Sequence, residues 1–300
     1  MSLPFLTTDD GDVILRAIQG TILTHDFRVH KLILSLASPV FKDMFTFPQP
    51  PEQNHSDQPD IPIVDVSDSP QVLDTILRFI YPGVELPTFT DLSTVSALLS
   101  AADKYNVASM RPTLRGALKT FVDVEPFRVY TVACRFGLWE EAKAAARLST
   151  LKTIILSTDH EKDIRHISGV DLYRLLLLSE SRENVGRARI RAFTSLDPDL
   201  YYIHCARHWA DCENFYALLE MKLQDTLTKN PWLQFDDLNE VLDTLPDPPF
   251  GCKPGHRDMN GLETTCPLRP SFIRSGLRLL AKDLARQNDL LLERAFEKEF

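Results

Sequence analysis

The stretch "FRVHKLILSLASPVFKDMF", residues 27–45, begins as a β-rich run and then becomes helical in pattern. After its first residues the apolar side chains follow the spacing of one helix face, at Leu32, Ile33, Leu36 and Ala37. Ser38 then offers a side-chain oxygen that can cap a new helix, and Pro39 suits a first helical position. A second helical pattern occupies residues 40–45. We therefore predict a strand and two short helices that meet at Ser38.

The residues around this stretch predict a small sheet and more helices. Two β-rich runs, residues 13–18 and 21–29, flank a turn at Gln19 and Gly20 and predict a hairpin. Residues 61–66 predict a short strand, and Pro62 places it at a sheet edge. Helical patterns follow at residues 70–81, 92–105 and 110–118. A strand layer followed by a helical majority is an α+β arrangement.

Beyond about residue 120 the strand patterns end, and the rest of the chain is predicted to be all-α. Residues 126–135 and 138–148 predict a helical hairpin joined at Gly137. Further helices are expected at residues 170–179, 212–227, 235–242 and 272–296. Residues 246–271 form the longest irregular connection in this scheme.

Composition and charge exclude several classes of protein. With 300 residues, 44% hydrophobic and 25% charged, the chain is long enough for two modest domains. The net charge of -9, without a basic cluster, counts against a nucleic acid partner. No targeting pattern or apolar run of about 18 residues indicates export or a membrane span. Five cysteines at irregular spacing favour free thiols in a reducing compartment, hence an intracellular location in the cytoplasm or nucleus.

Catalytic motifs are not evident in the sequence, and we predict a protein that is not an enzyme and has no cofactor. The sequence lacks the nucleophile-elbow and phosphate-loop patterns, and His160-Glu161 is followed by Lys162-Asp163 where a zinc protease requires a second histidine. Cys134 lies among apolar neighbours in an expected helix, which favours packing over nucleophilic attack.

Residues 10–119 resemble the BTB/POZ domain. The resemblance rests on a set of positions that we expect to build the fold: Asp12, His30, Lys31, Ser38, Pro39, Phe41 and Tyr81. The string at residues 129–138, followed by Glu141 and Ala142, resembles the helical extension of the large fungal BTB family. The chain then divides into a BTB/POZ domain at residues 10–119 and an α-helical C-terminal region at residues 120–300.

The resemblance implies short strands under a cluster of helices and a function in protein-protein interaction. Proteins of this kind form homodimers, regulate transcription or act as substrate adaptors for cullin-3 ubiquitin ligases. In such adaptors the loop before the 61–66 strand carries an apolar-x-Glu motif. Here the loop is Pro50-Pro51-Glu52-Gln53, with proline in place of the apolar anchor, which counts against cullin-3 as a partner. A homodimer is the expected assembly.

Two side-chain groups allow more than one interpretation. His30 and Lys31 stand at a strand-to-helix junction, where a structural histidine is the expected role, with Asp12 as its partner. Cys205 and His208 have Cys-x-x-His spacing, and a distant loop could complete a tetrahedral zinc site with Cys252, His256 and Cys266. Scattered thiols are also common as inert buried residues. We assign no metal ligand from the sequence.

Overall fold

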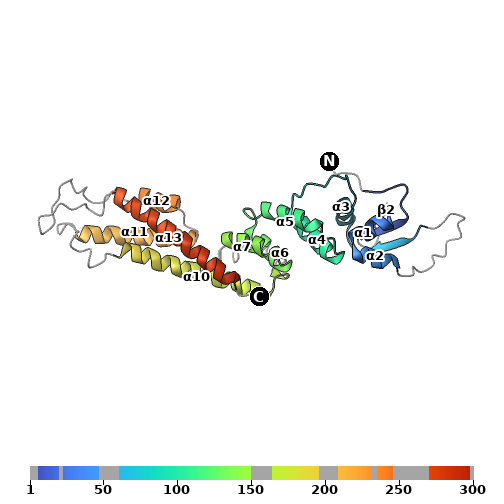
Figure 1. Cartoon of the computed structure of the whole chain (residues 1–300). Coiled ribbons are helices and arrows are strands. Elements are labelled where there is room, and N and C mark those ends of the chain that lie inside the picture. Colours follow the sequence, from blue (N-terminus) through green and yellow to red (C-terminus); the bar gives the residue numbers. More distant parts are fainter. Residues whose placement is uncertain are drawn as a thin grey trace. The chain divides into compact units, whose positions relative to one another are not determined.

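The computed structural model describes residues 6–19, 23–46, 61–149, 164–195, 209–230, 235–245 and 270–297. It divides the chain into two compact units, residues 1–145 (unit 1) and residues 146–300 (unit 2). Unit 1 holds the strands and the helices drawn from blue to green in Figure 1, and unit 2 holds the long helices drawn in yellow to red. The two units are described separately below.

Unit 1 contains a three-stranded sheet with the order β2-β1-β3. β1 (Val13–Gln19) pairs antiparallel with β2 (Leu23–Val29), and β3 (Ile63–Val66) pairs parallel with β1. Alternate residues of β1 point into the core, as the period of two in a strand requires, and Val13, Leu15 and Ala17 are fully buried. β3 lies at the edge of the described sheet, consistent with Pro62 just before it.

Six described helices of unit 1 precede α7. They are α1 (Lys31–Ala37), α2 (Pro39–Thr46), α3 (Pro70–Ile80), α4 (Leu92–Lys104), α5 (Met110–Thr120) and α6 (Pro126–Arg135). α3 packs on β1, and α4 packs on α3, α5 and α6. Ser69 and Asp91 cap α3 and α4, each accepting a hydrogen bond from a backbone N–H three residues later.

α7 (Trp139–Leu148) follows α6 through Gly137, whose φ of 64° lies in the left-handed region that glycine favours. The Glu141 carboxylate on α7 is fully buried, and the Arg115 guanidinium on α5 donates to its two oxygens, 3.0 Å away in each case. The Lys119 ammonium lies 3.5 Å from the same carboxylate. This pairing of charges fastens the start of α7 to the last helix of the predicted 10–119 domain.

We expect Arg115→Met to lower the free energy of unfolding of unit 1 by about 1–3 kcal/mol, because it removes two charge-assisted bonds from a buried carboxylate. Arg111→Met is the matched control: Arg111 also lies on α5, but its pair with Asp103 is solvent-exposed, so the loss should stay below about 1 kcal/mol. Urea unfolding of both variants measures the difference. Equal losses would contradict the role given to Glu141.

Unit 2 is a helical assembly of four described helices beyond α7. α10 (Gly169–Thr194) packs against α11 (Trp209–Lys229) and α13 (Pro270–Phe296), and α12 (Phe235–Asp243) packs against α11 and α13. The helices lie side by side in Figure 1, and their facing leucines, together with Ile190, Phe215 and Ile273, form one buried core. Each helix therefore buries a stripe against two neighbours.

α10 is much longer than the helix expected at residues 170–179. The polar sequence after Ser179 interrupts the apolar pattern, yet the helix continues to Thr194 because its buried face uses unusual residues. Arg182 is 1% exposed and donates to the Ala146 carbonyl at 3.1 Å, and its burial together with nearby Arg147 lowers its pKa to about 9. Gly186 lets Leu227 approach so closely that a Cβ atom would lie 2.7 Å from it.

The structure confirms the predicted fold class, an α+β part followed by an all-α part, and the described residues after Val66 contain no strand. The expected irregular connection at residues 246–269 lies outside the described residues, whereas residues 270 and 271 begin α13. The predicted boundary between residues 119 and 120 falls inside unit 1, at the end of α5, and stays a prediction.

Candidate interaction surface

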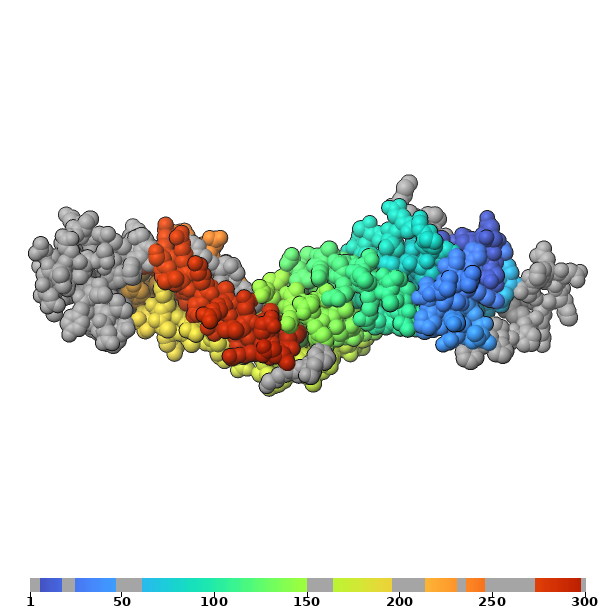
Figure 2. Space-filling model, in the orientation of Figure 1, coloured from blue at the N-terminus to red at the C-terminus, as the bar shows by residue number. Residues whose placement is uncertain are grey.

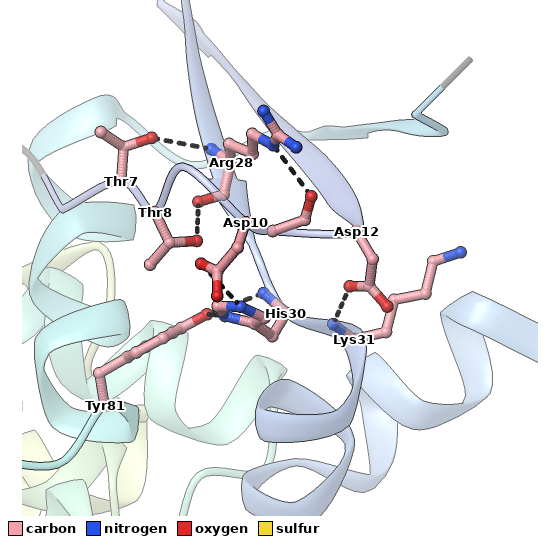
Figure 3. Close-up of polar contacts among 9 residues, drawn as sticks. Thr7, Thr8, Asp10, Asp12, Arg28, His30, Lys31 and Tyr81 are labelled. Atoms are coloured by element: carbon pink, nitrogen blue, oxygen red, sulfur yellow. Dashed lines mark hydrogen bonds and ion pairs between the residues drawn. The ribbon is translucent and has the colours of Figure 1, made fainter. Parts of the chain in front are cut away.

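The junction between β2 and α1 is held by the Tyr81 hydroxyl, at the end of α3. This oxygen accepts a hydrogen bond from the His30 backbone N–H at 2.8 Å and lies 3.1 Å from the His30 ring Nδ1 (Figure 3). Because the first backbone N–H groups of a helix have no partner within it, such bonds fix the start of α1. Burial raises the pKa of the Tyr81 hydroxyl, which stays neutral and able to serve both groups.

The two nearby carboxylates divide their roles differently from the expectation. The side chain that reaches the His30 ring is that of Asp10, whose oxygen lies 3.2 Å from Nε2, rather than that of Asp12. Asp12 instead accepts a hydrogen bond from the Lys31 backbone N–H at 2.7 Å (Figure 3). It thereby satisfies an otherwise unpaired donor at the N-terminus of α1, where a negative charge is also favoured by the helix dipole.

Gly11 lies between these two aspartates and allows the chain to pass close to β2. A Cβ atom at this position would lie 2.6 Å from the Val29 nitrogen and 2.7 Å from its oxygen, so only glycine fits. The Gly11 carbonyl also accepts a hydrogen bond from Arg28 Nε at 2.9 Å. The close approach places Asp10 and Asp12 over the start of α1.

Ser38 connects α1 to α2 and is fully buried. Its backbone N–H donates to the Leu34 carbonyl and ends α1, while its hydroxyl oxygen accepts from the Phe41 N–H at 3.1 Å and starts α2. The same hydroxyl donates to the Tyr105 carbonyl at the end of α4. Ser38 therefore caps one helix, ends another and joins both to a third.

We expect Ser38→Ala to lower the free energy of unfolding by about 1–2 kcal/mol, because it removes a helix cap and leaves a buried Tyr105 carbonyl with one fewer donor. Ser69→Ala is the control, since Ser69 caps α3 with one longer bond of 3.4 Å and should cost about 0.5–1 kcal/mol. Thermal or urea unfolding compares them. A Ser38 variant no less stable than the Ser69 variant would refute the joint role.

Phe41 and Tyr105 form the apolar side of this connection. Their rings stack with centroids 4.6 Å apart and an angle of 8° between planes, and both residues are buried. The Tyr105 hydroxyl donates to the Asp68 carboxylate, which also accepts from Lys104 Nζ at 2.6 Å. Burial and the bond to Asp68 raise the pKa of Tyr105 above that of a free tyrosine.

This shift predicts a loss of stability in alkali. Because the folded-state pKa of Tyr105 exceeds the unfolded value of about 10, the stabilisation is complete below about pH 10 and is lost as the pH rises toward the folded value. Urea unfolding between about pH 8 and about pH 11 should show a shallower decline for Tyr105→Phe than for the wild type. Tyr173→Phe, an exposed control, should leave the decline unchanged, and a wild-type slope in Tyr105→Phe would exclude this origin.

α1, whose start is fixed by Tyr81 and Asp12 and whose end is fixed by Ser38, presents two leucines to solvent. Leu32 and Leu36 belong to the apolar helix face predicted from the sequence, but their side chains are 70% and 80% exposed, and Leu34 is the residue that α1 buries completely. Positions four residues apart lie one above the other on a helix. Unit 1 therefore carries an apolar stripe, which we call the α1 stripe (Leu32 and Leu36).

The remaining predicted residues lie in varied positions. Pro39 is the exposed first residue of α2, and Cys134 is buried in α6. The loop with Glu52 and the proposed zinc ligands at positions 205, 208, 252, 256 and 266 lie outside the described residues. Within the described ranges no cluster of three His, Cys, Asp or Glu side chains could hold a metal ion. None of the described helices is long and apolar enough to cross a membrane.

Sequence comparison identifies the architecture of unit 1. A sequence model of the BTB/POZ domain matches residues 5–121 of the chain. Residues 5–121 are a BTB/POZ domain. This confirms the resemblance expected for residues 10–119, whereas the resemblance of residues 129–142 to the fungal helical extension stays a prediction.

The similar proteins match about a third of this chain. TD and POZ domain-containing protein 1 of Mus musculus is 36% identical over 94 residues, which are 31% of this chain and 24% of that protein. TD and POZ domain-containing protein 5 of the same species is 34% identical over 101 residues, 34% of this chain and 28% of that protein. The chain thus matches about a quarter of the length of these relatives. The BTB/POZ domain is a protein-interaction module and is generally non-enzymatic.

Proposed function

We propose that this protein self-associates through the α1 stripe of its BTB/POZ domain. The main support for this proposal is the exposure of Leu32 and Leu36, which are adjacent on one face of α1. The start of this helix is fixed by Tyr81 and Asp12, and its end is fixed by Ser38. An ordered apolar stripe is a surface that a second copy can cover without first folding a loop. The two-fold arrangement common in homodimers brings the same stripe together from both copies.

The burial of these leucines can supply a large part of the free energy of dimer formation. Burying one exposed leucine contributes about 1.5–3 kcal/mol, and a two-fold contact buries Leu32 and Leu36 in each of the two copies. A micromolar dissociation constant corresponds to about 8 kcal/mol, part of which must offset the lost freedom of two bodies. The leucines therefore supply a major share of a micromolar contact, with the neighbouring residues of α1 and α2 supplying the rest.

The test is the mass of the full chain in sedimentation velocity at low micromolar concentration. We expect Leu32→Asp/Leu36→Asp to reduce the mass relative to the wild type, because four carboxylates would meet at a two-fold contact. Val124→Asp is the matched control: Val124 is also an exposed apolar residue of unit 1, 76% exposed, but lies outside the α1 stripe. A double variant with the wild-type mass would exclude this contact.

The cullin-3 adaptor role is the weaker candidate. It depends on the loop before β3, where Pro50-Pro51-Glu52-Gln53 departs from the apolar-x-Glu pattern. We therefore prefer self-association to cullin-3 binding as the proposed function. In this proposal the protein is not an enzyme and works in the cytoplasm or nucleus, and the C-terminal region at residues 120–300 offers a further binding surface or stabilises the domain.

A further inference from the structure

The first half of α10 has apolar residues on two faces. One face packs into unit 2 and includes Leu175 and Leu178, which are buried. The other face is exposed and consists of Val170, Tyr173, Leu177, Glu180 and Asn184. These five positions, which we call the α10 seam, are separated alternately by three and four residues. Val170 and Tyr173 are 64% and 61% exposed, and Leu177 is 41% exposed.

Spacing of this kind indicates a helical partner. Alternation of three and four residues keeps side chains on one line along a helix, and this line is the contact surface when two helices pack in the manner of a coiled coil. Scattered exposed apolar residues need no explanation, but three at the first three positions of such a line form a continuous apolar surface.

A groove beside the α10 seam has room for a partner's side chains. It has a volume of about 500 Å³ and lies between the first half of α10 and the end of α13. Tyr173, Leu177 and Leu178 line it from α10, and Leu291 and Ala295 line it from α13. Figure 2 shows α13 (red) on the surface of unit 2, with α10 (yellow) beside it.

The charges at this groove favour a second copy of the same chain. Arg174 lies 5.8 Å from the centre of the Phe296 ring, so this turn of α10 faces the end of α13. The exposed Arg294 and Glu297 line the groove there. Glu180 is the exposed acidic member of the α10 seam. Neither Arg294 nor Glu180 forms an ion pair with the residues that the structure describes.

We infer that unit 2 contains a second self-association site, in which the α10 seams of two copies pack antiparallel about a two-fold axis near Leu177. This axis places Leu177 against Leu177 of the partner subunit. It also brings Glu180 of the partner subunit to the level of Arg174, which is the level of Arg294. The same axis sets Tyr173 beside Glu180 of the partner subunit and Val170 beside Asn184 of the partner subunit. The Leu177 pair is then the apolar centre, and the opposite charges on its two sides suit an isologous contact.

This site is independent of the α1 stripe, because it uses different residues in a different unit. A chain with two isologous sites can form assemblies larger than dimers, since each site joins one further copy. Substitutions in the α1 stripe and in the α10 seam should therefore lower the mass of the assembly separately. The failure of one proposal can then be distinguished from the failure of the other.

The experiment compares sedimentation velocity of the full chain and three variants at the same micromolar concentration. With both sites present, the wild type exceeds a dimer, whereas Leu32→Asp/Leu36→Asp and Tyr173→Asp/Leu177→Asp are each dimers and the fourfold variant is a monomer. If Leu32→Asp/Leu36→Asp is monomeric while Tyr173→Asp/Leu177→Asp keeps the wild-type mass, the α10 site is excluded and the α1 site stands. If Tyr173→Asp/Leu177→Asp is monomeric while Leu32→Asp/Leu36→Asp keeps the wild-type mass, the α1 site is excluded. If both are monomeric, the two sites are not independent and this inference is overturned.

A charge exchange in the Leu32→Asp/Leu36→Asp background tests the antiparallel arrangement and does not depend on apolar-to-acid substitutions in α10. Glu180→Arg or Arg294→Glu alone places like charges together and should raise the dissociation constant about tenfold, because each disturbs both ends of the contact. Glu180→Arg/Arg294→Glu together restores opposite charges and should recover most of the loss. If the combined variant loses as much affinity as the two single variants added together, the antiparallel arrangement is wrong. The same result is expected if the groove binds a helix of a different protein.

Discussion

The fold of unit 1 depends most on the hydroxyl group of Ser38. It accepts from the Phe41 N–H and donates to the Tyr105 carbonyl, so one buried oxygen fixes the angle between α1 and α2 and ties both to the end of α4. The stacked rings of Phe41 and Tyr105 then fill the space beside it. Together with the Tyr81 and Asp12 contacts at the start of α1, this connection fixes the direction of the helix and the surface that its two outward leucines form.

The local pattern of the sequence predicts most of unit 1, because its signals come from neighbouring residues. The role of Ser38 and Pro39 at the start of a helix follows from capping preferences, and the edge position of β3 follows from Pro62. The partner of His30 does not follow, since Asp10 and Asp12 lie only two residues apart and either could reach the ring. Their division of roles is set by the close passage of Gly11 beside Val29, which only the three-dimensional structure reveals.

The exposure of α1 and the length of α10 escape sequence analysis for a related reason. Helical spacing indicates that apolar residues share a face but not whether another element covers that face, and no element among the described residues of unit 1 covers Leu32 and Leu36. In α10 the opposite holds, because Arg182 and Gly186 occupy buried positions that a hydrophobic pattern does not count. The zinc hypothesis for Cys205 and His208 concerns residues outside the described ranges and stays a prediction.

The contacts that orient α1 use its main chain rather than its outward side chains. Tyr81 binds the backbone N–H of His30, and Asp12 binds that of Lys31, and every residue except proline carries this donor. Substitutions on the outer face of the helix therefore leave its anchorage intact. In the proposed self-association, substitutions at positions 32 and 36 change the contact surface while the supporting structure is retained.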